Sequence, residues 1–278
     1  MTARSPGGLR LAVSLLTAIP AGRVPPPDRR QVRAAMAWAP VVGLMVAAVG
    51  AMVLLAARVA FTSPIHDLPG AGTSVETATL ASALAIAATA LVSGGLHLDG
   101  FADTVDGWAS RAPRDRTLEI MADARLGSLG AAALILVLVI EIAALTLGVR
   151  AHHGTQSLVI SVVSGRVAML WGCTPRTPAA RPTGLGAMAA GSVPKWTAVG
   201  WTAALVVAAA AFGRWDPEAG SSFAAVRAAG AVVTAVASGW VIRRWAVRRL
   251  GGVTGDVLGA ISEVATVAAL LILDVRHP

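Results

Sequence analysis

Hydrophobic residues gather in runs that are long enough to cross a membrane as helices. Six runs are strongly apolar: 34–61, 75–96, 128–149, 196–213, 223–242 and 256–273. A seventh, weaker run covers 157–172. A membrane-spanning helix needs about 20 predominantly apolar residues. The pattern predicts an all-α fold, a polytopic membrane bundle of about seven transmembrane helices that forms a single domain, 1–278.

A shorter apolar segment, LAVSLLTAI, follows Arg4 and Arg10 and gives residues 1–22 the look of a signal peptide. The run is short and lacks a good small-residue cleavage site. We expect a retained N-terminal interfacial or re-entrant helix that ends at the three prolines of residues 25–27.

Composition supports membrane insertion, because 55% of the 278 residues are hydrophobic, 14% are charged and the mean hydropathy is +0.69. Of the 23 basic residues, 17 lie on one side of the predicted topology, in the segments 4–33, 111–125, 176–195 and 243–249. By the positive-inside rule this side is cytoplasmic, with the N-terminus inside and the C-terminus outside. Topology thus accounts for the net charge of +8, and we expect no nucleic-acid partner.

Six carboxylates and four arginines lie within residues 94–127 of an otherwise apolar chain. Asp99, Asp103 and Asp106 have the spacing i, i+4, i+7, which places them within an arc of roughly 60° on one helix face. Glu119 and Asp123 repeat the i, i+4 spacing after a short loop. Two such acidic faces could meet around a hard cation with oxygen ligands, and Mg²⁺ is the natural candidate.

A second acidic segment, GGVTGDVLGAISE at residues 251–263, opens the last apolar run. Asp256 and Glu263 share a helix face, and a carboxylate inside a span normally faces a bundle interior or a wet cavity. We expect both to face the first acidic stretch. The glycines of this segment form a small-xxx-small series that permits close helix contact.

Other polar residues also lie within or beside the apolar runs. Arg166 needs a carboxylate or a phosphate as its partner, and Glu141 is interpreted as structural, paired with Arg58 or Arg227. The stiff loop 173–195 contains Arg181 and two glycines that could present donors to a substrate phosphate. The single cysteine, Cys173, excludes an intrachain disulfide and is interpreted as a buried apolar residue.

Carboxylates, a metal ion and nearby arginines suit phosphoryl transfer from a diphosphate. His97 could act as a general base for an attacking hydroxyl, or it could orient a ligand or bond to the backbone. Motifs for a P-loop, a GxSxG elbow or an HExxH zinc site do not occur in the sequence.

The chain resembles the cobalamin synthase (adenosylcobinamide-GDP ribazoletransferase) family. The resemblance consists of five sequence blocks, which occur in order and extend over nearly the whole chain. The blocks are LRLAVSLLTAIP, GGLHLDGFADTVDG, LEIMADARLGSLG, PAARPTGLG and GGVTGDVLGAISE. The resemblance implies an Mg²⁺-dependent membrane enzyme of the bacterial inner membrane. It would join adenosylcobinamide-GDP to α-ribazole or its 5′-phosphate, releasing GMP and forming adenosylcobalamin or its phosphate.

The resemblance places most of the candidate residues in these ordered blocks, and we infer their individual roles from their charge and spacing. The metal would be held by Asp99, Asp103 and Asp106, with Glu119 and Asp123 completing the shell. The substrate would be bound by Arg125, Arg166, Arg181 and Glu263, and the catalytic group would consist of His97, Asp99, Asp103, Asp106 and Asp256. The lipid bilayer is an expected partner, and a homo-oligomer is left open.

Two other classes of function compete with this interpretation. A CDP-alcohol-type membrane phosphotransferase also uses clustered aspartates and a metal, but its pattern needs an arginine where this chain has Asp103 after Phe101 and Ala102. A cation-coupled transporter would place its carboxylates near the membrane midplane, often in repeated halves. This chain gathers its acidic residues toward one face and shows no repeat.

Overall fold

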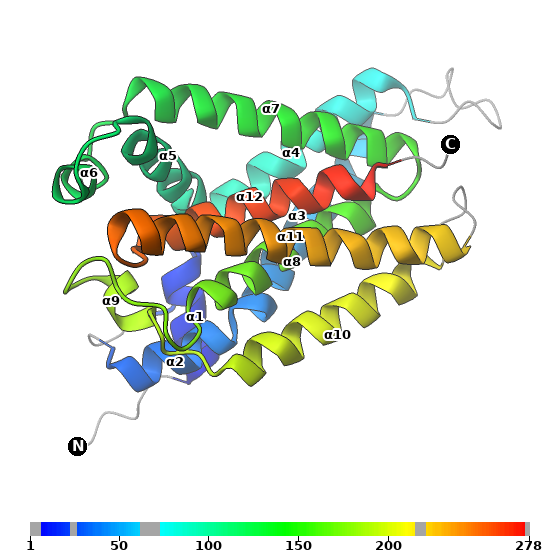
Figure 1. The fold of residues 1–278 in the computed structure, drawn as a ribbon. Helices are drawn as coiled ribbons and strands as arrows, with labels where there is room; N and C mark the ends of the chain where they lie inside the picture. The colour runs from blue at the N-terminus through cyan, green and yellow to red at the C-terminus, as the bar shows by residue number, and fades with distance from the viewer. Residues whose placement is uncertain (1–6, 23–26, 62–72, 215–220, 276–278) are drawn as a thin grey trace.

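The computed structural model describes residues 7–22, 27–61, 73–214 and 221–275, and these residues fold into helices (Figure 1). The long helices are α3 Ala39–Phe61, α4 Val75–Val92, α7 Ser128–Arg150, α8 Gly154–Gly172, α10 Lys195–Gly213, α11 Ser221–Leu250 and α12 Gly255–Leu273. The shorter helices are α1 Gly8–Leu16, α2 Arg29–Ala37, α5 Leu96–Ala109, α6 Arg114–Ile120 and α9 Leu185–Ala189. Over the described ranges no strand forms, and the all-α prediction is confirmed.

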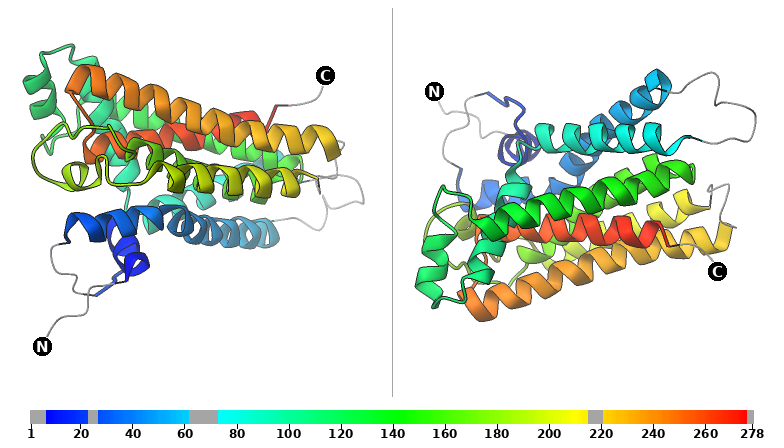
Figure 2. Two further views of the ribbon diagram at one scale, coloured as in Figure 1. Left: turned by 60° about the horizontal axis from the view of Figure 1, so that its bottom comes forward. Right: turned by 90° about the horizontal axis from the view of Figure 1, so that it is seen from above.

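The long helices lie side by side and alternate in direction (Figures 1 and 2). At one end of the bundle α4, α8 and α11 finish, while α3, α7, α10 and α12 begin; we call it the α5 end. The short helices α5, α6 and α9 gather there, beside α1 and α2. Every segment for which the sequence predicts site chemistry is therefore close to, or leads into, the same end of the molecule.

Six of these helices are long and apolar enough to cross a membrane, namely α3, α4, α7, α10, α11 and α12. The weaker predicted run, 157–172, is also a helix, and it forms most of α8. Of the 19 residues of α8, 15 are buried. Because α8 is surrounded by protein, it tolerates serines and Arg166 that a lipid-facing helix would not.

Three boundaries of the predicted runs are wrong. The run 223–242 is too short, because α11 continues to Leu250. The run 34–61 is divided at Trp38, so that residues 34–37 belong to α2 and the long helix starts at Ala39. Pro40 lies in the first turn of α3, where a missing N–H costs no helical hydrogen bond. The run 75–96 ends at Val92, because Gly94 and Gly95 adopt positive φ values of 65° and 68° and turn the chain into α5.

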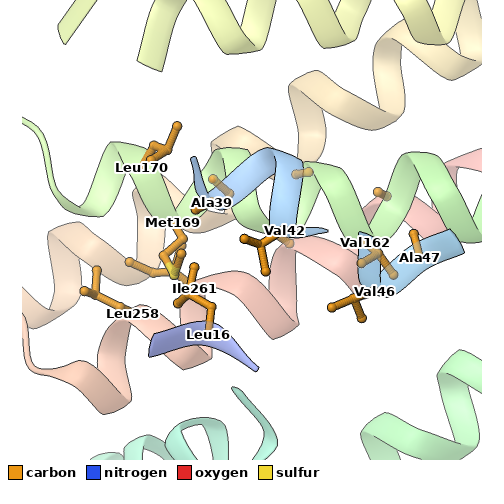
Figure 3. Close-up of a cluster of buried hydrophobic side chains, with 14 of the residues drawn as sticks. Leu16, Ala39, Val42, Val46, Ala47, Val162, Met169, Leu170, Leu258 and Ile261 are labelled. Atoms are coloured by element: carbon orange, nitrogen blue, oxygen red, sulfur yellow. The ribbon is translucent and has the colours of Figure 1, made fainter. Parts of the chain in front are cut away.

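The core close to the α5 end forms where α1, α3, α8 and α12 meet (Figure 3). Leu16 of α1, Val42 of α3, Met169 of α8 and Ile261 of α12 point into this cluster and are all buried. Burying a side chain of this size stabilises a fold by roughly 1.5–3 kcal/mol relative to leaving it exposed to water. The short helix α1 is therefore packed against the bundle through its apolar face.

Candidate functional site

The candidate site is built on a close contact between α5 and α12. A Cβ atom at Gly100 would lie 2.7 Å from the carbonyl oxygen of Asp256, and one at Gly259 would lie 3.3 Å from the backbone of His97. Only glycine permits the first of these approaches, because any other residue would force the helices apart. The contact brings Asp99 and Asp256 to the wall of the same cavity.

This α5–α12 cavity has a volume of about 300 Å³. Its polar wall contains His97, Asp99, Arg181, Thr254 and Asp256. Its apolar wall comes from several helices and from the turn before α12, and it includes Leu15, Leu16, Met36, Leu96, Met169, Leu185, Val253 and Leu258. A concave apolar site with a few convergent charged groups is the usual form of a ligand pocket. The expectation that Asp256 faces the first acidic stretch is confirmed.

Arg181 reaches the cavity from the loop between α8 and α9, as the sequence suggests. Its Nη2 donates a hydrogen bond to the carbonyl oxygen of Leu118 at 2.7 Å, and its Nη1 lies 3.7 Å from Oδ2 of Asp256. Thr254 Oγ1 donates to the same Oδ2 at 3.2 Å and accepts from the backbone N–H of Val257, so it also caps α12. Asp256 is thus oriented by a hydroxyl and a guanidinium.

The loop that carries Arg181 is held in place by backbone and arginine contacts. Ala180 N–H donates to the carbonyl of Val253, and Val253 N–H donates to the carbonyl of Pro178. Arg114 of α6 donates through Nε to the carbonyl of Leu250 and through Nη2 to that of Ala180, each at 2.8 Å. The prediction of a stiff loop next to the site agrees with this bracing.

Asp103 is half-buried on α5 among like charges and is not part of the lining of the α5–α12 cavity. Burial, and then the carboxylates of Asp99, Asp256 and Asp106, raise the pKa of Asp103 to about 6, against the opposing charge of Arg181. A carboxyl that is partly buried among like charges gives up its proton less readily than an exposed aspartate. The repulsion among these groups is the electrostatic signature that the sequence spacing predicts.

Asp106 has a structural partner. Its Oδ2 accepts from the N–H of Gly127 at 2.9 Å and its Oδ1 from the N–H of Gly130 at 2.8 Å, at the start of α7. A carboxylate at a helix N-terminus is stabilised by unpaired N–H groups and by the helix dipole. Both oxygens therefore accept hydrogen bonds that anchor α5 to α7. Each oxygen keeps a further lone pair, so the metal-ligand role expected for Asp106 stays a prediction.

Glu119, Asp123 and Arg125 lie apart from the cavity. α6 ends at Ile120, so Asp123 does not share a helix face with Glu119, contrary to expectation. Glu119 pairs with Arg116 at 2.8 Å, and Asp123 pairs with Arg125 at 2.7 Å, with exposed side chains. Hydrogen bonds from Arg125 lower the pKa of Asp123 to about 2. The two acidic faces do not meet, and across the described residues no three His, Cys, Asp or Glu side chains form a ready metal cage.

His97 lies between the α5–α12 cavity and a second, smaller cavity deeper in the bundle. We call the second cavity the polar chamber; its polar lining is Thr89, Ser93, His97, Glu141, Arg166, Glu263 and Thr266. Burial, and then the Arg166 guanidinium, lower the pKa of His97 well below its ordinary value, so its ring is neutral at pH 7.

The polar chamber corrects two expectations and agrees with a third. Glu263 lines it instead of facing the acidic stretch. Arg166 has the carboxylate partners that the sequence calls for, because Glu263 and Glu141 lie close to it, and its Nη1 donates to Ser262 Oγ at 2.6 Å. Glu141 contacts Glu263 and lies near Arg166, instead of pairing with Arg58 or Arg227. Helical periodicity gives the face of each residue but not the neighbouring helix, so the sequence could not show that these three groups meet.

Two parts of the site are not among those predicted from the sequence. Leu15, Leu16 and Met36 of α1 and α2 form one wall of the α5–α12 cavity, whereas the sequence suggests only a peripheral role for this segment. Thr254, which bonds Asp256, has a signal in the sequence, because a threonine before Gly-Asp at the start of an apolar run is typical of a helix N-cap.

The fold and the site first indicate the class to which this protein belongs. Membrane-length helices with a carboxylate- and arginine-lined cavity at one end are those of an integral membrane protein with a polar cavity at one end of its bundle. A family model described as cobalamin-5-phosphate synthase matches residues 8–274, and the chain belongs to this family. It is accordingly an enzyme of cobalamin biosynthesis.

Curated relatives agree with the family assignment. An adenosylcobinamide-GDP ribazoletransferase from Frankia casuarinae is 37% identical over 97% of this chain and 95% of its own length. Proteins with the same name from Bradyrhizobium diazoefficiens and Pseudomonas savastanoi are 32% and 39% identical, covering 95% and 70% of this chain and 92% and 75% of their own lengths. No solved structure matches the chain.

Proposed function

We propose that this chain transfers the adenosylcobinamide phosphate group of adenosylcobinamide-GDP to α-ribazole or α-ribazole 5′-phosphate. GMP leaves, and adenosylcobalamin or its 5′-phosphate forms. The observation that carries the proposal is the convergence of Asp99, Asp256 and Arg181 on one cavity of about 300 Å³. Family membership supports this reaction over the CDP-alcohol and transporter alternatives.

Roles for the residues follow from their positions. Arg181 is placed to bind a phosphate oxygen of the diphosphate, since its guanidinium already approaches the cavity next to Asp256. The apolar wall from α1, α2 and α8 excludes water and holds the uncharged parts of the substrates. A hydroxyl of the ribazole ribose attacks the corrinoid-linked phosphorus, the bond to the GMP oxygen breaks, and the proton of the hydroxyl is released.

Mg²⁺ fits Asp99 and Asp103, with Asp256 next to them. Mg²⁺ is commonly bound through one or two carboxylates plus substrate phosphates, so a preformed cage of three side chains is not needed. The raised pKa of Asp103 supports this assignment, because repulsion from neighbouring carboxylates contributes to it after burial, and a cation would relieve that repulsion. When bound, the ion would neutralise charge on the diphosphate and on the leaving phosphate.

We also propose that the α5 end faces the cytoplasm of a bacterial cell and that the bundle lies in the inner membrane. The distribution of Arg and Lys supports this orientation, because their cytoplasmic excess is the usual topological signal. The nucleotide substrate would then reach the cavity from the cytoplasm.

Activity of the purified protein in lipid nanodiscs tests the function. The full chain is incubated with adenosylcobinamide-GDP, Mg²⁺ and either ribazole form, and products are separated by chromatography and identified by mass. We expect equimolar GMP and cobalamin or cobalamin phosphate with at least one acceptor. Protein that is folded but releases no GMP with either acceptor would overturn the proposal.

A further inference from the structure

The polar chamber lies inside the bundle, behind the wall of the α5–α12 cavity. Glu141 is the 14th residue of α7 and Glu263 the ninth of α12, so they lie about 20 Å and 12 Å along their helices from the α5 end. Arg166 reaches the same place from α8. A carboxyl at such a depth costs several kcal/mol by insertion scales, so its neighbours must compensate.

Two buried polar atoms at the chamber have no hydrogen-bond partner among the described residues. They are Nδ1 of His97 and Nε of Arg166, on side chains of residues that are each only 5% exposed. Leaving a buried donor or acceptor unpaired costs about 1–3 kcal/mol. Both residues line the chamber. A molecule bound in the chamber that both donates and accepts hydrogen bonds would therefore pair with these two atoms.

The hydroxyls of the chamber leave only acceptor positions open. Thr89, Ser93 and Thr266 each donate their proton to a carbonyl of their own helix, at 2.8 to 3.1 Å. Each oxygen keeps lone pairs that can accept from a ligand. Together with the carboxyls they offer acceptors, while Arg166 Nε offers a donor.

Charge selects the ligand. An anion would face Glu141 and Glu263, and a metal cation would face the fixed positive charge of Arg166. A small neutral molecule that both donates and accepts suits the site. The chamber has a volume of about 40 Å³, and a water molecule needs at least about 10–15 Å³ of such volume and two to four polar partners, so two waters fit.

We propose that the polar chamber binds internal water, and that this water, bonded to His97 Nδ1 and Arg166 Nε, fixes the His97 ring at the wall of the α5–α12 cavity. Glu141 and Arg166 are then positioning residues, which act on the site through His97. The water site stands independently, whereas its effect on catalysis rests on the proposed function.

Infrared spectroscopy of the protein in nanodiscs tests the water site. Films are hydrated with D₂¹⁶O or D₂¹⁸O, and O–D stretching bands of internal water are identified by their isotope shift. The wild-type protein and Glu141→Gln should show such bands, and Glu141→Met should lose at least one of them, because the thioether fills the space and bonds water poorly. Identical isotope-sensitive bands in wild type and Glu141→Met would overturn the proposal.

A pair of milder substitutions tests the water site if the Glu141→Met protein does not insert into the membrane. Thr266 and Thr146 are both buried threonines whose Oγ1 donates to the carbonyl four residues earlier, but only Thr266 lines the chamber. Thr266→Val should shift a water band, and Thr146→Val should leave every band in place. Equal spectra for the two valine variants would contradict the site.

Steady-state kinetics tests the positioning effect. Glu141→Met should lower kcat for GMP release by at least about tenfold, with KM for adenosylcobinamide-GDP unchanged within about twofold, since misplacing a group at the reacting centre affects the chemical step. The separate variant Glu141→Gln should have the kcat of the wild-type protein. A rise in KM with unchanged kcat would overturn the positioning role. Water bands in a wild-type protein that makes no product would instead count against the proposed function alone.

Discussion

Gly100 of α5 lies directly against the backbone of Asp256 in α12. A Cβ at position 100 would lie 2.7 Å from the carbonyl oxygen and 2.8 Å from the Cα of Asp256, distances that real Cβ atoms do not adopt. Because backbone atoms cannot swing aside like a side chain, this contact fixes the separation of the two helices that carry Asp99 and Asp256. The geometry of the site depends on one missing methyl group.

Gly100→Ala should therefore lower GMP release by at least about tenfold, because α5 must shift relative to α12 and a displacement of about 1 Å can cost 10²-fold. The matched control is Gly200→Ala in α10, where an added Cβ meets nothing within 4 Å. This control should retain activity and gain up to about 1 kcal/mol of stability from helix propensity. Similar activities of the two alanine variants would contradict the close-contact argument.

Asp103→Asn should abolish turnover while the protein still inserts and folds. The amide has the size of the carboxyl but removes the charge that supports a cation, and Asp103 lies among Asp99, Asp106 and Asp256. Activity and size-exclusion profiles of the same preparation check both statements. Near-normal activity in a correctly folded Asp103→Asn protein would remove the metal-site argument.

The Mg²⁺ requirement should depend on pH. The pKa of Asp103 is raised to about 6 in the folded protein, so without a cation its stability contribution falls as the pH rises through about 6. A cation needs the ionised carboxylate and competes with this proton. The Mg²⁺ concentration for half-maximal activity should then be about tenfold higher at pH 5 than at pH 7.5. An unchanged requirement would show that Asp103 does not bind the ion.

Asp106→Ala should mainly lower stability. It leaves the N–H groups of Gly127 and Gly130 without their carboxylate, and losing a helix cap typically costs about 0.5–2 kcal/mol. Thermal unfolding in nanodiscs would measure the loss, with Asp115→Ala as the control, because the Asp115 side chain is 85% exposed. A melting temperature as high as that of the control would contradict the anchoring role.

Asp123→Asn should leave activity within about twofold of wild type. The residue pairs with Arg125 at the surface, and exposed ion pairs contribute little to stability. A loss of turnover comparable with that of Asp103→Asn would show that the α6 segment closes onto the site during the reaction.

Sequence patterns predict the helices well because apolar length is a local property. The run 128–149 differs from α7 by only one residue at its C-terminal end, and the spacing of Asp99 and Asp103 correctly indicates one helix face. The i, i+4 argument fails for Glu119 and Asp123 because it assumes a helix, and α6 ends at Ile120 before the second residue.

Contacts between helices could not be predicted in the same way. The role of Asp106 depends on where α7 begins in space, and the meeting of Glu141 with Glu263 depends on how α7 and α12 are rotated against each other. Neither is encoded in the periodicity of a single helix. The position of Asp256 is predictable from the sequence, because a carboxylate close to the start of an apolar helix has few possible neighbours other than the acidic stretch.

We propose that the phosphoryl group is transferred in the cavity between α5 and α12. The most direct test compares GMP release by wild type, Asp256→Asn and Arg125→Gln under the same conditions in nanodiscs. Asp256 lines the cavity, whereas the Arg125 side chain is 89% exposed. We predict that Asp256→Asn loses at least about 10²-fold in kcat/KM while Arg125→Gln stays within about twofold. Full activity in folded Asp256→Asn protein would contradict the account.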